Sequence, residues 1–231
     1  MLAQDLEQYL TSAYCVDSDH PAVAMLADEL TNSADSDITN TLKLYYWVRD
    51  EVRYNPYALG STRDAFKASA VLASGESWCV PKATLLTALC RAAGMPARLG
   101  YADVRNHLST AKMRETMSTD VFYYHGYCSH YLEGQWVKST PAFNIELCDK
   151  FGLKPLEFDG HADSLYHEFD QAGNKHMQYL HDRGEYTDVP FDEIMANFQE
   201  HYAGLMAAVN DTNQLNSNDW DTDVASETGK A

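Results

Sequence analysis

The chain opens with apolar residues at helical spacing. Over residues 2–14 every fourth position is apolar, and an apolar helical face recurs over 38–53. Between these stretches, Asp19 and Pro21 form the expected cap and first turn of another helix, which runs to about Thr31. The pattern therefore predicts three helices in the N-terminal quarter.

The pattern changes from helical to alternating in the middle of the chain. An apolar helical stretch starts at Cys79 and ends at Gly94, a residue type common where helices stop. A strand is expected over 96–105, and residues 118–143 predict two strands joined by a tight turn at 133–135. Helices followed by neighbouring strands predict the α+β class, with a helix packed on an antiparallel sheet.

The last third of the chain has a mixed pattern. Residues 157–186 are ambiguous, whereas 189–209 predict a helix with Asp192 as its cap. Residues 210–231 are polar, acidic and poor in apolar side chains, so they predict a disordered tail. The expected organisation is a single domain over residues 1–209 followed by this tail.

Composition adds a strong negative charge to this picture. The chain of 231 residues is 45% apolar, as in globular proteins, and its formal net charge is −17. No basic patch stands out, so nucleic acids and anionic membrane surfaces are not expected partners. The N-terminus lacks the basic start and apolar run of a signal peptide, and no apolar stretch approaches the ~20 residues of a membrane span. A soluble, cytoplasmic protein is expected.

The five cysteines fit neither a disulfide scaffold nor a structural zinc site. Their number is odd, and no two of them form a CxxC pair. Cys79 and Cys90 are eleven residues apart on one predicted helix. That is roughly 16 Å, beyond the ~7 Å limit for bridged Cα atoms, so Cys90 is expected in the core. Strand alternation puts His125 on the opposite face from Cys128 and His130, so no metal or other cofactor is expected.

Cys79 stands where a thiol can be activated. At the start of a helix, unpaired N–H groups and the positive end of the dipole favour the thiolate and can stabilise an oxyanion. A proton acceptor is still needed, and the candidates are His107, His125 and His130, on or near the predicted sheet. A Cys–His pair would support acyl chemistry, whereas an inert core thiol is the alternative interpretation.

Three segments of the chain, in order, resemble one known family. They are "LYYWVRDEVRYNPY" (44–57), "WCVPKATLLTALCRAAGMPARLGY" (78–101) and "HGYCSHYLEGQWVKSTP" (125–141). Together they resemble the transglutaminase-like superfamily of papain-fold thiol enzymes. The resemblance implies a papain-like core at about 38–145, with a nucleophile helix packed on an antiparallel sheet. Extra helices are expected at the N-terminal and C-terminal ends.

The resemblance assigns roles to individual residues. Cys79 falls on the nucleophile, and His125 falls on the catalytic histidine, which in the family precedes the second tryptophan, here Trp136, by eleven residues. Thr140 occupies the place of the family's orienting aspartate. Strand alternation puts Thr140 on the face of Trp136 and so beside His125, and Asn144 is the second candidate for orienting the ring.

The resemblance implies a cysteine enzyme that acts on the amide bonds of a peptide or protein. Hydrolysis is favoured over acyl transfer because water is always available. Two interpretations from other classes stay open: a binding module that has lost catalysis with the aspartate, and a protein that uses Cys79 as a redox sensor.

Two further expectations concern the cleft around the nucleophile. Without a carboxylate beside His125, the pKa of Cys79 is expected below the ordinary value of about 8.5 but above the ~3–4 of a strongly activated thiol. Trp78 and Tyr101 are the candidates for lining the cleft and binding the substrate.

Overall fold

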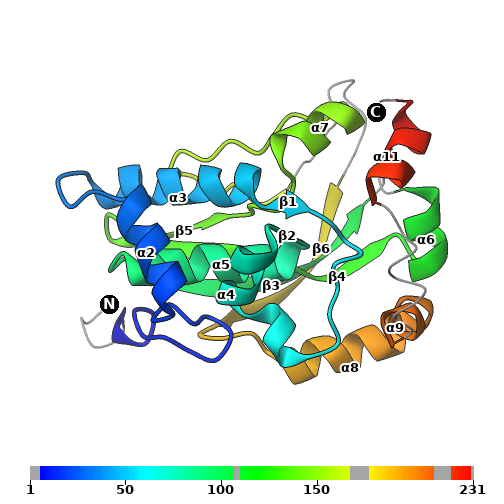
Figure 1. Cartoon of the computed structure of the whole chain (residues 1–231), viewed down its shortest axis with the longest axis horizontal. Coiled ribbons are helices and arrows are strands. Elements are labelled where there is room, and N and C mark those ends of the chain that lie inside the picture. Colours follow the sequence, from blue (N-terminus) through cyan, green and yellow to red (C-terminus); the bar gives the residue numbers. More distant parts are fainter. Residues whose placement is uncertain (1–5, 107–109, 167–176, 211–219, 230–231) are drawn as a thin grey trace.

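A four-stranded antiparallel sheet lies at the centre of the computed structural model, which describes residues 6–106, 110–166, 177–210 and 220–229. The strand order is β5-β4-β3-β6. In chain order the strands are β3 (Ala97–Asn106), β4 (Val121–Leu132), β5 (Gln135–Ser139) and β6 (Met177–Tyr186). The sheet and the helices around it confirm the predicted α+β class (Figure 1).

The β4–β5 hairpin follows its predicted position closely. The two strands pair from Cys128 opposite Ser139 to Leu132 opposite Gln135, and the turn between them occupies the predicted place. By contrast, β6 comes from the ambiguous part of the sequence. Most of its side chains are at least partly exposed, so it lacks the apolar alternation that identifies a half-buried strand.

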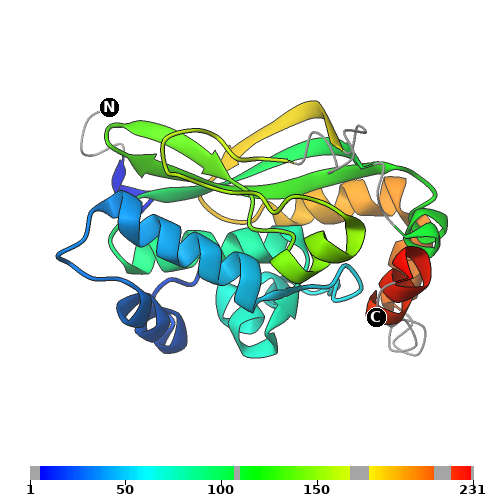
Figure 2. The ribbon, with the colours of Figure 1, turned by 90° about the horizontal axis from the view of Figure 1, so that it is seen from above.

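The helix α5 (Cys79–Ala92) is the central helix and is buried from Cys79 to Arg91. It packs against β4 and is surrounded by three other helices, α2 (Pro21–Leu30), α3 (Asp37–Glu51) and α4 (Ala68–Ser74). Together these helices cover one face of the sheet (Figure 2). Each of the buried leucines of α5 contributes about 1.5–3 kcal/mol. The polar side chains of α5 that are buried bond to backbone carbonyls, as Lys82 does to Arg49 over 3.0 Å.

A short two-stranded parallel sheet fixes the chain where it enters α5. Its strands are β1 (Arg53–Tyr54) and β2 (Glu76–Ser77), with Tyr54 opposite Ser77. A short 3-10 helix, η1 (Arg63–Phe66), lies in the connection between them. This pairing places Tyr54 next to the start of α5.

The predicted helix over residues 2–14 is not formed in the described part of that segment. Residues 6–10 form only a short helical turn. The carbonyl of Tyr9 accepts a hydrogen bond from the N–H of Ala97 on β3, 3.0 Å away. The backbone at Tyr9 therefore bonds to the first residue of β3 instead of continuing a helix.

Two predicted helix caps are wrong by one or two residues. The side chain of His20, and not Asp19, accepts the N–H of Ala22 at the start of α2. Pro190, and not Asp192, precedes the first residue of the C-terminal helix, and its side chain makes no capping hydrogen bond.

The predicted helix over 189–209 is in fact two helices, α8 (Phe191–His201) and α9 (Ala203–Asn210). Tyr202 separates them because its backbone leaves the helical region, with φ −124° and ψ 44°. Two further short helices, α6 (Ala111–Met117) and α7 (Ile145–Phe151), were not predicted.

Residues 220–229 do not follow the prediction of a disordered tail. The helix α11 (Trp220–Thr228) packs its buried Trp220 against the rings of Tyr54, Tyr57 and Phe151. The hydroxyl of Tyr57 also donates to Asp223 over 2.6 Å. One aromatic side chain thus anchors an otherwise polar segment, while residues 211–219 lie outside the described residues. No helix in the described ranges is long and apolar enough to cross a membrane.

Candidate active site

Cys79 is the first residue of α5, and its thiol faces backbone N–H groups. The groups that point at the sulfur belong to Cys79 itself, to Val80 and to Gly126 of β4. Gly126 permits this contact because a Cβ there would lie only 2.9 Å from the Cα of Val80. The predicted helix-start position therefore gives Cys79 the donors that can stabilise negative charge.

Burial nevertheless dominates the acidity of this thiol. Cys79 is 4% exposed, and burial raises its pKa to about 11 although the backbone N–H groups lower it. The prediction of a pKa below the ordinary value is therefore wrong for this structure. At neutral pH the thiol is protonated, and it needs a base before it can attack.

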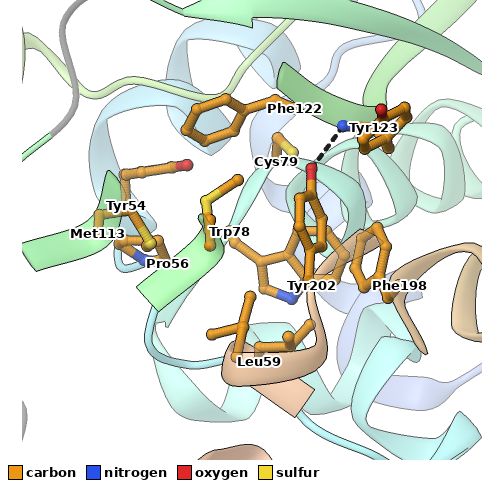
Figure 3. A pocket seen from close by; sticks show the side chains of 12 residues that line it. Tyr54, Pro56, Leu59, Trp78, Cys79, Met113, Phe122, Tyr123, Phe198 and Tyr202 are labelled. Carbon is orange, nitrogen blue, oxygen red and sulfur yellow. Dashed lines mark hydrogen bonds between the residues drawn. The ribbon is translucent and has the colours of Figure 1, made fainter. Parts of the chain in front are cut away.

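A narrow apolar pocket with a cavity volume of about 40 Å³, partly open to solvent, surrounds Cys79. Figure 3 shows its walls, which come from parts of the chain far apart in sequence. Tyr54 and Leu59 come from the segment before α5, Met113 from α6, Phe198 from α8, and Tyr202 from the junction between α8 and α9. The last third of the chain thus forms one side of the pocket.

The two residues predicted to line the cleft have different positions. Trp78 lines the pocket beside Cys79, with its ring against Phe66 and Phe198. Tyr101 lies instead in the core, fully buried, with its ring near Tyr124 and Tyr186. The position of Tyr101 agrees with that of its strand, because β3 is an inner strand of the sheet with a strand on each side.

His125 and Thr140 line one narrow hollow, together with Phe143 and Met177. This agrees with the alternation argument that placed the two side chains near each other. The hydroxyl of Thr140 is buried and has no hydrogen-bond partner among the described residues. The hydrogen bond that Thr140 was expected to accept from the ring of His125 is therefore not formed in this structure.

The backbone of His125 lies next to Cys79. The N–H of Gly126 points at the sulfur, and the Cα of His125 is about 2.4 Å from that nitrogen across one peptide bond. The groups that lower the pKa of the Cys79 thiol are backbone N–H groups. The structure brings the two residues together through the backbone, while pairing of their side chains stays a prediction.

A β-bulge lies next to His125 in the pairing of β3 with β4. The pairing of β3 with β4 shifts register between Ala102 and Val104, and Tyr124 has a positive φ of 54°. The N–H of Tyr124 donates to a carboxylate oxygen of Asp103 over 3.2 Å. Arg183 of β6 holds that carboxylate from the other side, with hydrogen bonds of 2.8–3.0 Å. Sequence reasoning missed Asp103 and Arg183 because a bulge and its partners have no short motif.

Asn144 has a structural contact, and its role in orienting His125 stays a prediction. Its side-chain oxygen accepts the N–H of Tyr54 over 3.2 Å, and it precedes the first residue of α7. Asn144 therefore holds β1, and with it Tyr54, against the start of α7. His107, the other early candidate for the base, lies outside the described residues.

A second cysteine–histidine group lies further along α5. Cys90 Sγ is 3.5 Å from His130 Nδ1, and Cys128 Sγ is 3.6 Å from the same nitrogen. His130 Nε2 is 2.7 Å from the hydroxyl of Ser139. Cys90, Cys128 and Ser139 are fully buried and His130 is 1% exposed, so Cys90 is a core residue as predicted. In the described part of the chain, no group of three or more candidate side chains is arranged to hold a metal ion.

Comparisons with known proteins agree with the resemblance noted in the sequence. Residues 24–141 match the family model of the transglutaminase-like superfamily. A search of the curated proteins found no match.

Two solved structures resemble this chain in fold. One is a "putative cysteine protease" from Cytophaga hutchinsonii, with 19% identity, a TM-score of 0.47, and coverage of 80% of this chain and 55% of the other. The second is a "putative protease" from Parabacteroides distasonis, with 15% identity, a TM-score of 0.37, and coverage of 58% of this chain and 25% of the other. The chain spans about half the length of the first and a quarter of the second.

Proposed function

Because this chain belongs to the transglutaminase-like superfamily, we propose that it is a cysteine enzyme that cleaves amide bonds of a peptide or protein. Cys79 is the nucleophile and His125 is the base. The observation that carries the proposal is the position of the Cys79 thiol at the edge of an apolar pocket, where it faces three backbone N–H groups. One of these groups belongs to Gly126, the residue that follows His125.

The proposed reaction follows from the protonated state of the thiol. His125 takes the thiol proton as Cys79 Sγ attacks the carbonyl carbon, and the backbone N–H groups at the start of α5 stabilise the oxyanion. The C–N bond then breaks, and His125 gives its proton to the leaving amine. Water attacks the thioester with loss of its proton to His125, the C–S bond breaks, and the proton returns to Cys79.

Hydrolysis is the favoured outcome, and transfer to an amine is the second. Both share the thioester and differ only in the group that attacks it. The pocket around Cys79 supports a substrate with an apolar side chain next to the reacting carbonyl, since its walls are aromatic and aliphatic.

The test is cleavage of an unfolded protein substrate such as reduced, alkylated casein, with and without a primary amine. The parent protein should generate new chain ends, and Cys79→Ala should lose at least about 10³-fold of that rate. Cys148→Ala is the matched control, since Cys148 is a buried cysteine outside the pocket. Incorporation of the amine without new chain ends would favour transfer. Equal rates in the parent and Cys79→Ala would overturn the proposal.

A further inference from the structure

One edge of β4 beside Cys79 is paired over only part of its length by the strands that the structure describes. On one side, residues 121–130 of β4 pair with β3. On the other side β5 pairs only with Cys128–Leu132. Within the ranges the structure describes, no strand covers the second edge of β4 between Val121 and Tyr127. A free strand edge presents N–H and C=O groups that an extended peptide can bind.

The hydroxyl of Tyr202 occupies two of these backbone groups. It accepts a hydrogen bond of 2.6 Å from the N–H of Tyr123 and donates one of 2.8 Å to the C=O of Val121. These two groups flank Phe122. In a parallel pair of strands, one residue of the neighbouring strand makes the same two bonds, through its own C=O and N–H. The single hydroxyl therefore performs the hydrogen bonding of one residue of a parallel peptide.

This part of the edge is also a wall of the pocket around Cys79. Phe122, Tyr123 and Tyr202 all line that pocket, and Figure 3 shows the Tyr202 hydroxyl bonded to the Tyr123 nitrogen close to Cys79. A peptide bound along the edge would therefore pass the thiol. Its side chains would enter a pocket whose walls are mostly apolar.

Tyr202 is placed where it can be displaced without breaking a helix. It is the one residue between α8 and α9, and its backbone is already outside the helical region. The α9 helix packs closely against α6. A Cβ at Gly204 of α9 would lie only 2.8 Å from the carbonyl oxygen of Thr116 in α6. The ring of Tyr202 packs on Phe198 and Tyr123, with centroids 4.9 and 5.7 Å apart.

We infer that the free edge of β4 at Val121–Tyr123 is a docking site for an extended peptide that binds parallel to β4 and displaces the hydroxyl of Tyr202. Tyr202 is then a built-in occupant that keeps these backbone groups bonded when no peptide is present. The inference rests on the proposed function only where it identifies this peptide with the substrate of Cys79.

The experiment measures peptide binding in the absence of turnover. The protein is Cys79→Ala, and the probe is an N-acetylated, C-amidated pentapeptide with leucine at its centre, titrated by calorimetry. Tyr202→Phe in the same background removes the competing hydroxyl and should tighten binding on the order of fivefold. Tyr46→Phe is the matched control, since the Tyr46 hydroxyl bonds Glu157 and Phe158 away from the pocket, and it should leave the affinity unchanged.

A second probe keeps the test independent of how Tyr202→Phe folds. The same pentapeptide, N-methylated at the central residue, cannot donate to the Val121 carbonyl and should bind about fivefold or more weakly to Cys79→Ala. Absence of binding, or equal binding of both peptides, would overturn the docking site. If instead the peptides behave as expected but the parent protein cleaves nothing, the docking site stands and the proposed function fails.

Discussion

The helix α5 carries two cysteines, Cys79 and Cys90, whose candidate histidine partners, His125 and His130, both lie on β4. The two cysteine–histidine pairs differ in almost every property except composition. Cys90 lies 3.5 Å from a ring nitrogen of His130, yet both side chains are sealed in the core. Cys79 faces backbone N–H groups at the start of α5 and lines a pocket. Proximity of a thiol to an imidazole therefore does not identify an active site. Access to substrate and donors for the oxyanion are also required.

The pKa directions support this distinction. The pKa of Cys90 is raised well above its usual value by its hydrogen bond to Cys128 and by burial, and Cys90 is fully buried. The pKa of Cys79 is raised as well, but only by burial, and the adjacent backbone N–H groups oppose that effect. Binding of a substrate in the pocket changes the surroundings of Cys79 and leaves those of Cys90 as they are.

The largest expected effect on kcat/KM comes from replacing each of the two histidines separately. His125→Gln should lower kcat/KM for amide cleavage by about 10²–10⁴-fold, because the protonated thiol loses its base. His130→Gln should leave kcat/KM within about threefold, because the ring is in the core, and should instead lower the free energy of unfolding by about 1–3 kcal/mol. Steady-state kinetics and chemical denaturation of both variants measure these effects. A larger kinetic loss in His130→Gln would reverse the assignment.

A carboxylate at position 140 should sharpen the difference between the two groups. Thr140→Asp puts a negative charge in the hollow that His125 lines, which favours the imidazolium and should lower the apparent pKa of Cys79 by about one unit. The pH dependence of Cys79 alkylation measures this shift.

Thr140→Val is the matched control for that change. The hydroxyl of Thr140 has no hydrogen-bond partner among the described residues, so its removal should leave the apparent pKa unchanged. A shift in Thr140→Val as large as in Thr140→Asp would show that the charge is not the cause.

A smaller effect on kcat is expected from a substitution at the bulge next to His125. Asp103→Asn weakens the contact with Arg183 while leaving an oxygen for the Tyr124 N–H. Asp103 acts through the backbone, so kcat should fall about three- to tenfold with little change in KM. Asp182→Asn, on the neighbouring strand, is the control. A change in KM alone would indicate that Asp103 affects substrate binding and not the position of His125.

Sequence and structure agree where local pattern decides the outcome. The α5 helix, β3 and the β4–β5 hairpin follow from periodicity and turn residues, and the family resemblance supplied Cys79 and His125. The hairpin also placed His125 and Thr140 in one hollow through strand alternation.

Tertiary contacts decide the rest, and the sequence pattern does not contain them. The acidic C-terminal segment forms α11 because Trp220 finds an aromatic site made by distant residues. The break at Tyr202 depends on a hydroxyl that bonds a strand about 80 residues earlier in the chain. Likewise, the raised pKa of Cys79 reflects the C-terminal helices that cover the pocket, and no motif around Cys79 reports them.

Site-resolved alkylation of the folded parent protein tests most directly whether Cys79 is the nucleophile. Iodoacetamide labelling is followed by mass spectrometry of the five cysteine-containing segments over a range of pH. We expect Cys79 to react first, with a rate that rises about tenfold per pH unit between about pH 7 and pH 10, because its pKa is about 11. Cys90 and Cys128 should stay unlabelled until the protein unfolds. Faster labelling of Cys90 than of Cys79 in the folded protein would contradict the account.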